Sequence, residues 1–265
     1  MEDNVKTQIC HEANKKFINE ALSGYDKFKY LPYWLKNKSN YLERERISPP
    51  RSQKIYKRGS IIYVDFGINV GNELSGNHFA IVLNNTDNAR NGVLSVVPIS
   101  SKDKKSYIEV GKIIEIPSIK HFVSHADKIE SEMKCLLTAL IDKRLIQDEH
   151  LSGELREIYK NGNPMSPEDA VKKMEDSGIK WDDENSVLRK INSLEEERKA
   201  YRKVFLAYQK YSKNSFVMPL SIQTISKDRI RQINKFDPSG KIKSPVDVMI
   251  KIDNAIIKNY TKCNG

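Results

Sequence analysis

Apolar residues recur with a helical period at the start of the chain. Between residues 3 and 22 they are spaced three or four positions apart, and Gly24 follows as a stop signal. A stretch rich in tyrosine and lysine comes next and ends at Pro49 and Pro50, which break the pattern. Aromatic rings among basic residues can stack on RNA bases, but they more often belong to a helical arm packed on a neighbouring domain. We therefore expect a helical arm over residues 1–57.

From residue 59 the pattern changes to that of strands. Apolar and β-branched runs are separated by turns rich in glycine, asparagine and lysine, and they span residues 60–66, 78–84, 93–100 and 107–110. Strand character returns at residues 215–218 and 222–225, and Ser244-Pro245 opens a last amphipathic helix. Several short strands joined by short turns are typical of a small barrel.

The segment between these strands has a helical period. Residues 129–145 alternate apolar and charged positions, and apolar residues from Leu188 to Tyr208 mark one face of a long helix. Ser166 and Pro167 are an N-cap serine and a proline at the first helical position. We therefore predict an α+β protein whose barrel, residues 58–117 plus 215–262, is interrupted by a helical insertion over residues 118–214.

The charge is concentrated at the two ends of the sequence. The chain has 45 Lys and Arg against 35 Asp and Glu, a net charge of +10. Residues 1–58 carry +6 and residues 215–265 carry +5, while the remainder is close to neutral. If the ends meet in the fold, they form a basic surface suited to a polyanion such as RNA; otherwise they are a solvated face.

The cysteines and the hydropathy pattern indicate where the protein works. Cys10, Cys135 and Cys263 lie far apart, and an odd number excludes a fully paired disulfide framework. No window approaches the ~18 apolar residues of a membrane span, and the N-terminal residues lack the apolar stretch of a secretory signal. We expect a cytoplasmic protein with reduced thiols.

Five segments carry a resemblance to a known family. They are Lys57-Arg-Gly-Ser-Ile-Ile-Tyr-Val-Asp-Phe66, Val70-Gly-Asn-Glu73 with the strand Ala80-Ile-Val-Leu83, Val96-Val-Pro-Ile-Ser100, Ile222-Gln-Thr-Ile-Ser-Lys-Asp-Arg-Ile230, and a terminal helix with Ile252-Asp253. In this order they resemble the MazF/PemK family of toxin endoribonucleases. The resemblance covers about 107 residues, 59–117 plus 215–262. It implies an SH3-like antiparallel β-barrel of the MazF/CcdB type, with the arm and the insertion as additions.

The resemblance also implies a reaction and its residues. Members of the family cut single-stranded RNA without a metal: the ribose 2′-OH attacks the adjacent phosphate and leaves a 2′,3′-cyclic phosphate and a 5′-OH end. The family places an arginine before its second strand and a threonine at the end of its third. His78 and Ser100 stand at these positions. Serine keeps the hydroxyl donor, whereas histidine exchanges a permanent charge for a group that titrates near neutral pH. We therefore predict His78 and Ser100 as catalytic residues.

Further residues are candidates for RNA contacts. They are Lys57, Arg58, Asn72, Glu73, Lys102 and Gln223, the last of which replaces an arginine that is frequent in the family. Glu73 can equally hydrogen-bond loop amides, and each single lysine or arginine can equally be solvated. His121 and His125 have the spacing of a metal pair on a helix, but no third ligand lies nearby in the sequence. We expect no metal and no cofactor.

Three functions compete on this barrel. The first is an endoribonuclease toxin that is neutralised by a small acidic antitoxin and for which the family implies a homodimer. The second is a binding module like the gyrase-poisoning toxin CcdB, which shares the barrel but is no nuclease. CcdB-like proteins act through a C-terminal Trp-Gly-aliphatic end, and this chain has Tyr260-Thr-Lys-Cys-Asn-Gly265 instead. The third is an RNA-binding regulator without activity, which is favoured if the family's arginine is indispensable.

Overall fold

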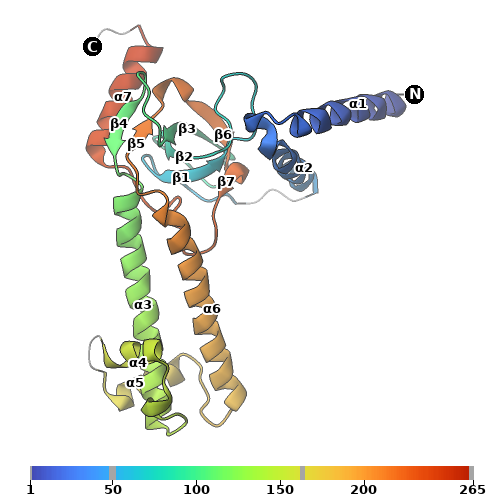
Figure 1. Ribbon diagram of the computed structural model, residues 1–265. Helices are drawn as coiled ribbons and strands as arrows, with labels where there is room; N and C mark the ends of the chain where they lie inside the picture. The colour runs from blue at the N-terminus through green and yellow to red at the C-terminus, as the bar shows by residue number, and fades with distance from the viewer. Residues whose placement is uncertain (1, 48–51, 162–164, 263–265) are drawn as a thin grey trace. The chain divides into compact units, whose positions relative to one another are not determined.

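The computed structural model describes residues 2–47, 52–161 and 165–262 of an α+β protein (Figure 1). Pro49, Pro50 and Cys263 lie outside the described residues. The chain divides into two compact units. The first, here called the barrel unit, comprises Met1–Ile114, Lys213–Gln232 and Ser239–Gly265. The second, here called the helical unit, comprises Glu115–Ser212 and Ile233–Pro238.

The barrel unit contains an antiparallel sheet, which has seven strands in the part of the chain that the structure describes. They are β1 (Ile61–Asp65), β2 (Asn77–Val82), β3 (Val93–Ser100), β4 (Ile108–Gly111), β5 (Ser215–Val217), β6 (Gln223–Ser226) and β7 (Ile230–Arg231). Hydrogen-bonded neighbours follow the order β4-β5-β3-β2-β1-β7, and β6 pairs with β3. The first four strands lie within two residues of the predicted runs. The two-residue strand β7 was not predicted, because it is too short to have a period.

The sheet closes on itself through the segment that contains β6 and β7. Residues Val93 to Val96 of β3 pair with β6, while Ile99 and Ser100 pair with β5. From β6 the chain passes through the 3-10 helix η4 (Lys227–Arg229) into β7, which pairs with β1. Because β6 borders β3 and β7 borders β1, this segment joins the two outer strands of the β1–β2–β3 meander. The predicted fold class, an antiparallel barrel with a helical insertion, is confirmed.

Alternate residues of the strands form the core of the barrel. A strand points successive side chains to opposite faces, so that every second residue faces inward. The inward cluster consists of Tyr56, Ile62, Val64, Phe66, Ala80, Val82, Leu94, Val96 and Ile225. Full burial of a side chain such as Ile62 or Leu94 contributes about 1.5–3 kcal/mol relative to exposure.

Two elements are attached to the barrel from the ends of the sequence. Helix α7 (Val246–Tyr260) buries Val248 and Ile252, and its Asp253 forms an ion pair with Arg58. The N-terminal arm consists of α1 (Glu2–Leu22), the 3-10 helix η1 (Asp26–Tyr30) and α2 (Leu31–Ile47). None of the described residues of α1 is buried, and the contacts of the arm with the strands and their loops come from η1 and α2. Both ends of the sequence therefore lie in the barrel unit.

The helical unit is built around α3 (Glu115–Asp142) and α6 (Glu184–Gln209), with the shorter η2 (Asp148–His150), α4 (Gly153–Lys160) and α5 (Pro167–Asp176). The hydroxyl oxygen of Ser166 accepts the N–H of Asp169 at 3.1 Å, which confirms the predicted cap of α5. Helix α3 begins fourteen residues before the predicted start at Ile129. Pro117 did not prevent this, because proline is tolerated in the first turn of a helix.

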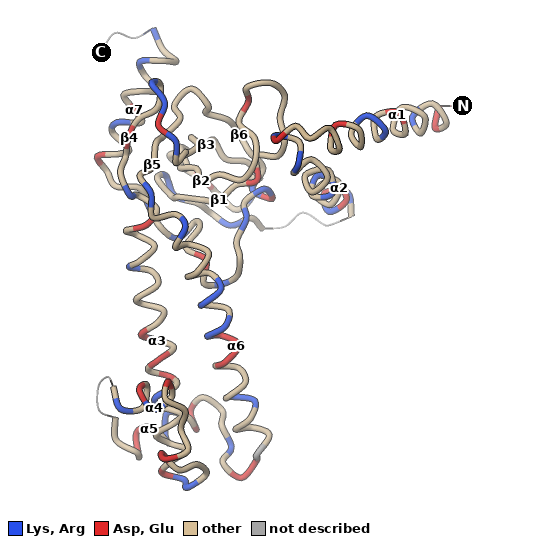
Figure 2. Tube along the Cα trace, viewed as in Figure 1, with Lys and Arg blue, Asp and Glu red and all other residues tan. Residues whose placement is uncertain are grey.

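Aromatic rings fill the space between α3 and α6. Phe122 of α3 meets Tyr201, Phe205 and Tyr208 of α6 edge-on, with ring centroids 5.5–6.0 Å apart. Lys and Arg alternate with Asp and Glu along α6, as Figure 2 shows. The unit is thus held by an apolar seam and carries charges of both signs on its surface. No helix among the described residues is long and apolar enough to cross a membrane.

Candidate active site

His78 lies where the loop from β1 enters β2. It pairs with Val64 of β1, and the alternation of the strand puts its side chain on the same face as the core residue Ala80. The ring is half-buried, and its centroid lies 6.3 Å from that of Phe66. Its Nε2 atom is 3.2 Å from the carbonyl oxygen of Ser75, which can only accept, so this nitrogen carries the hydrogen.

The surroundings of His78 keep its ring neutral. Burial lowers the pKa of His78 below its ordinary value of 6.5. Hydrogen bonds with the backbone of Ser75 and Ile99 raise the pKa, but by less, and the positive charge of Lys102 lowers it further. At pH 7 the imidazole is therefore uncharged and able to accept a proton. A neutral imidazole differs in this from an arginine, which provides a permanent, forked cation.

Two more candidates lie at the end of β3, next to His78. Ser100 is the last residue of β3 and directly follows Ile99, whose backbone the His78 ring contacts. Its hydroxyl oxygen accepts the backbone N–H of Lys102 at 3.0 Å and so shapes the turn after the strand. The side chain of Lys102 is exposed and close enough to act on the pKa of His78. The structure thus brings an imidazole, a hydroxyl and a cation together.

The loop between β1 and β2 is held by hydrogen bonds among its own residues. The side-chain amide of Asn69 donates to the carbonyls of Phe66 and Leu74, and the hydroxyl of Ser75 accepts the N–H of Asn69. Asn72 and Glu73 lie at the exposed tip. The loop is therefore ordered by Asn69 and Ser75, which the sequence analysis did not single out. An asparagine in a glycine-rich loop is the signal that could have found the first of them.

Comparison with protein families identifies the segment that carries this site. Residues 57–157 match the family described as PemK-like, MazF-like toxin of type II toxin-antitoxin system. The chain resembles the PemK/MazF-like toxins. No curated protein matches the chain. This match confirms the resemblance to the MazF/PemK family over the motif segments that lie within residues 57–157, whereas the two segments after residue 215 lie outside the matched range. The matched range includes β1 to β4, hence both His78 and Ser100, and extends into α4.

The other candidates of the toxin-like site lie apart from His78. Lys57 is exposed ahead of β1. Arg58 donates to the carbonyl of Leu83 and forms its ion pair with Asp253, at the opposite end of β1 from the His78 pairing. Gln223 begins β6 and pairs with Val96 in the middle of β3. The structure brings together His78, Ser100 and Lys102, and gives Arg58 partners within the protein.

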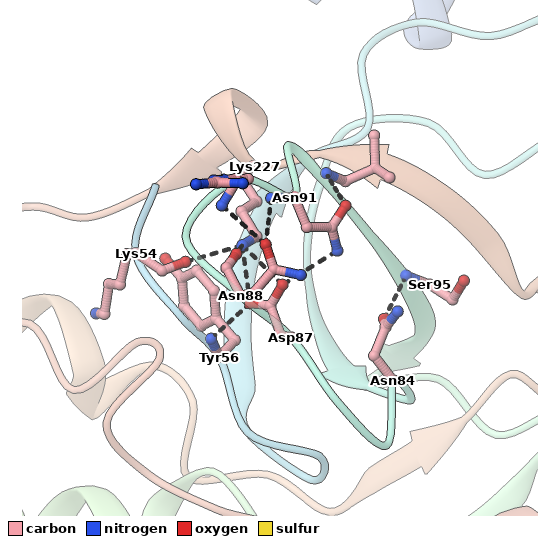
Figure 3. Close-up of polar contacts among 10 residues, drawn as sticks. Lys54, Tyr56, Asn84, Asp87, Asn88, Asn91, Ser95 and Lys227 are labelled. Atoms are coloured by element: carbon pink, nitrogen blue, oxygen red, sulfur yellow. Dashed lines mark hydrogen bonds and ion pairs between the residues drawn. The ribbon is translucent and has the colours of Figure 1, made fainter. Parts of the chain in front are cut away.

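At the other end of the barrel, a cluster of polar side chains around Lys227 and Asp87 is buried and internally hydrogen-bonded (Figure 3). The ammonium group of Lys227 contacts both carboxylate oxygens of Asp87 at 2.8–2.9 Å and donates to the carbonyl of Lys54 at 3.0 Å. The Lys227 and Asp87 side chains are only 2% and 0% exposed. Burial alone raises the pKa of Asp87, but hydrogen bonds from Lys227, the Tyr56 N–H and Asn91 hold it below its ordinary value. This cluster therefore ties the strand ends together, and its two charged side chains are almost inaccessible to a ligand.

The histidine pair of the helical unit makes other contacts. His121 Nε2 is 3.1 Å from the carbonyl oxygen of Phe236, and His125 Nδ1 is 2.9 Å from the carbonyl oxygen of His121. In the described ranges, no group of three or more His, Cys, Asp or Glu side chains is arranged to hold a metal ion. Cys10 is exposed and Cys135 is buried, and both are free thiols.

Proposed function

We propose that the chain is a metal-independent endoribonuclease of a type II toxin-antitoxin system. The observation that carries this proposal is the match of residues 57–157 to the toxin family, because that range holds His78 and Ser100 at one rim of the barrel. The barrel unit has 27 Lys and Arg against 15 Asp and Glu, whereas the helical unit has 18 against 20. Such an excess of positive charge favours binding of a polyanion.

The proposed reaction assigns one task to each of three side chains. The neutral imidazole of His78 takes the proton of the ribose 2′-OH as the 2′ oxygen forms a bond to phosphorus. Lys102 and the hydroxyl of Ser100 stabilise the negative charge that builds on the phosphate oxygens. The bond from phosphorus to the 5′ oxygen then breaks, this oxygen takes a proton from water, and the imidazolium returns its proton to the solvent. The products are a 2′,3′-cyclic phosphate and a 5′-OH end.

The partners follow from the toxin family and from the charge. A type II toxin has a protein antitoxin, and a small acidic one fits the basic barrel unit. Asn72, Glu73, Lys57 and Gln223 are kept in the proposal as further RNA contacts. We also propose a homodimer and a cytoplasmic location, as for family members.

The experiment that tests the proposal is an analysis of RNA ends. Single-stranded RNA labelled at its 3′ end is incubated with the purified full chain in excess EDTA. We expect fragments whose 5′ ends accept phosphate from a polynucleotide kinase directly, and 3′ ends that become substrates of a phosphatase only after acid opens the cyclic phosphate. Cleavage that stops in EDTA and returns with a divalent ion would contradict the metal-independent mechanism.

One observation favours a second function. The residue at the position of the family's arginine is a histidine, and the permanent charge and the forked donors are lost there. RNA that binds the full chain but stays intact at every pH would therefore favour a non-catalytic RNA-binding module on the same barrel. RNA that neither binds nor is cut would favour a protein-binding module.

A further inference from the structure

A cleft of about 350 Å³ lies between the N-terminal arm and the barrel. The arm lines it with Tyr30, Tyr33 and Trp34, and the barrel lines it with Asp65, Gly67 and Asn77. Asn77 is the residue immediately before His78 and points to the opposite face of β2. The cleft thus borders the β2 residue that precedes His78 in the sequence, and its wall from the arm belongs to a part of the chain outside the family match.

Trp34 is a fixed wall of this cleft. A Cβ atom on Gly67 would lie 2.5 Å from the indole ring, so the ring rests directly on the glycine backbone. The guanidinium carbon of Arg229 is 5.3 Å from the ring centre. Arg229 in turn donates to the carbonyl of Asp65 at 2.8 Å. These contacts hold the indole in one place, which is what a stacking surface requires.

The two tyrosines beside Trp34 are left exposed. Tyr33 is 69% exposed and Tyr30 is 57% exposed, although both line the cleft. By contrast, the hydroxyl of Tyr41 on the same helix as Tyr33 is directed at Asp65, at 3.4 Å. The arm therefore uses some of its aromatic residues for packing and leaves others free. Exposed aromatic surface that borders a cleft is typical of a binding site.

The polar groups of the cleft suit the edges of a base. Asn77 is exposed, and the Asn37 amide donates to Asp65 Oδ2 at 3.1 Å. The Asp65 carboxylate also accepts the N–H of Gly67 at 3.1 Å and lies 4.0 Å from Arg231, so its charge is compensated. Residues 25–47 carry six Lys and Arg against three Asp and Glu, which favours phosphates around the cleft.

We propose that this cleft binds a nucleobase of single-stranded RNA, stacked between Trp34 and the exposed tyrosines. Unpaired bases are recognised by stacking on aromatic rings and by hydrogen bonds to amide groups, and this cleft offers both. The identity of the ligand as RNA rests on the proposed function. The arm then extends the substrate site beyond the family barrel, and the bound nucleotide sits against α2.

Fluorescence of Trp34 tests the proposal in the full chain. Trp181 is the second tryptophan, so Trp181→Phe leaves Trp34 as the reporter. The probe is single-stranded oligodeoxyuridine, which lacks the 2′-OH nucleophile and cannot be cut, and the comparison strand is an abasic phosphodiester of the same length. We expect oligodeoxyuridine to quench Trp34 and to bind more tightly than the abasic strand. Truncation of a stacking residue typically weakens binding about 5- to 150-fold for each base.

Three variants separate stacking from charge and folding. Tyr33→Ala should weaken the binding of oligodeoxyuridine about 5- to 150-fold and leave the affinity for the abasic strand unchanged. Tyr33→Phe should bind oligodeoxyuridine like the parent chain, because it keeps the ring. Tyr25→Ala is the matched control, since Tyr25 is 61% exposed on the same arm but does not line the cleft. Equal affinity of both strands, or equal weakening by Tyr25→Ala and Tyr33→Ala, would overturn the proposal. So would Trp34 quenching by an acidic peptide but not by oligodeoxyuridine.

The outcomes also distinguish this proposal from the proposed function. If Tyr33→Ala cuts RNA and binds oligodeoxyuridine like the parent chain, the cleft is not a base subsite although the nuclease stands. If oligodeoxyuridine binds with the predicted dependence on Tyr33 but RNA is never cut, the subsite stands and the chain is an RNA-binding module.

Discussion

The two ends of the barrel treat charge in opposite ways. At the end where β2 runs into β3, Lys227 and Asp87 are almost inaccessible, and their polar atoms are engaged by the backbone and by Tyr56 and Asn91. At the end where β1 runs into β2, His78 is half-buried, Lys102 is exposed and Tyr33 stands open beside a cleft. At the first end the polar groups are paired with one another and stabilise the fold, whereas at the second end they remain accessible to a ligand.

This contrast teaches how the chain separates folding from function. A buried ion pair is costly to break, because the remaining partner is an uncompensated charge in a dry environment. Residues at such a place cannot be exchanged without a large loss of stability. At the open end, a change of side chain alters chemistry while the strands remain paired. The proposed replacement of the family's arginine by His78 is therefore compatible with an intact barrel.

The largest expected effect is the loss of cleavage at the open end. His78→Ala should slow RNA cleavage about 10²–10⁴-fold, because a general base is removed. Binding of uncuttable oligodeoxyuridine should hardly change, since the basic surface remains. His11→Ala is the matched control, because His11 is an exposed histidine of α1. Cleavage rates of the two variants on one RNA are compared, and an unchanged rate in His78→Ala would remove this residue from the mechanism.

The pH profile of the parent chain sharpens this test. A base must be neutral, and the pKa of His78 lies below 6.5 because of burial. The cleavage rate should therefore rise with pH up to that pKa and be flat above 6.5. A rate that falls as the pH rises through this range would assign His78 the role of an acid instead. In His78→Arg the acid limb of the profile should vanish.

The next effect is a loss of stability at the closed end. Lys227→Ala should lower the free energy of unfolding of the barrel unit by about 3–5 kcal/mol, because Asp87 is left buried and unpaired. Lys6→Ala, which removes an exposed pair with Glu2 on α1, should cost about 0.3–0.5 kcal/mol. Urea unfolding followed by Trp34 fluorescence in the Trp181→Phe background measures both. Equal losses in the two variants would erase the distinction between the ends.

A smaller effect concerns the contact between Trp34 of the arm and Gly67 of the barrel. Gly67 has a φ of +77° and touches the Trp34 ring, so Gly67→Ala introduces backbone strain of about 1–2 kcal/mol and a clash as well. The emission of Trp34 should shift to longer wavelength as the ring leaves the barrel. In the Trp34→Ala background the same substitution should cost only the backbone strain, as measured by urea unfolding. An identical cost in both backgrounds would show that the ring does not rest on Gly67.

The smallest effect is the pH dependence of stability, because His78 and Asp87, at the two ends of the barrel, change the free energy of unfolding in different pH ranges. The lowered pKa of His78 means that the unfolded chain binds the proton more readily, so this contribution is lost as the pH falls from 6.5 through the folded pKa. The lowered pKa of Asp87 adds stability that is present above its ordinary 3.8 and lost as the pH falls below it. We expect His78→Gln to reduce the dependence of the urea midpoint on pH only below 6.5 and above the range in which Asp87 titrates. Asp87→Asn should reduce it only at and below pH 3.8.

The sequence predicted the fold well where one segment carries its own signal. The strand at residues 93–100 and the Ser166-Pro167 helix start were found, because period and capping are local properties. The position of His78 at the entry of β2 followed from the resemblance. The sequence did not indicate that Arg58 is engaged by Asp253, 195 residues away, since such a pair leaves no local pattern.

The same limit applies to the cleft and to the pKa of His78. The tyrosine-rich stretch allowed either stacking on RNA or packing on the barrel. In the structure Tyr41 contacts Asp65, Trp34 rests on Gly67 and also lines the cleft, and Tyr30 and Tyr33 stay exposed. An isolated histidine titrates near 6.5, and only the burial of its ring and its neighbours move that value.

By itself the sequence determined the periods, the caps, the order of the family motifs and the excess of charge at both ends. The tertiary structure decided which of those charges form ion pairs within the protein, how β6 and β7 close the barrel, and which face of the arm remains exposed. The physical reason is range: backbone propensity acts over a few residues, whereas burial, ion pairing and strand partners join residues that are far apart in the chain.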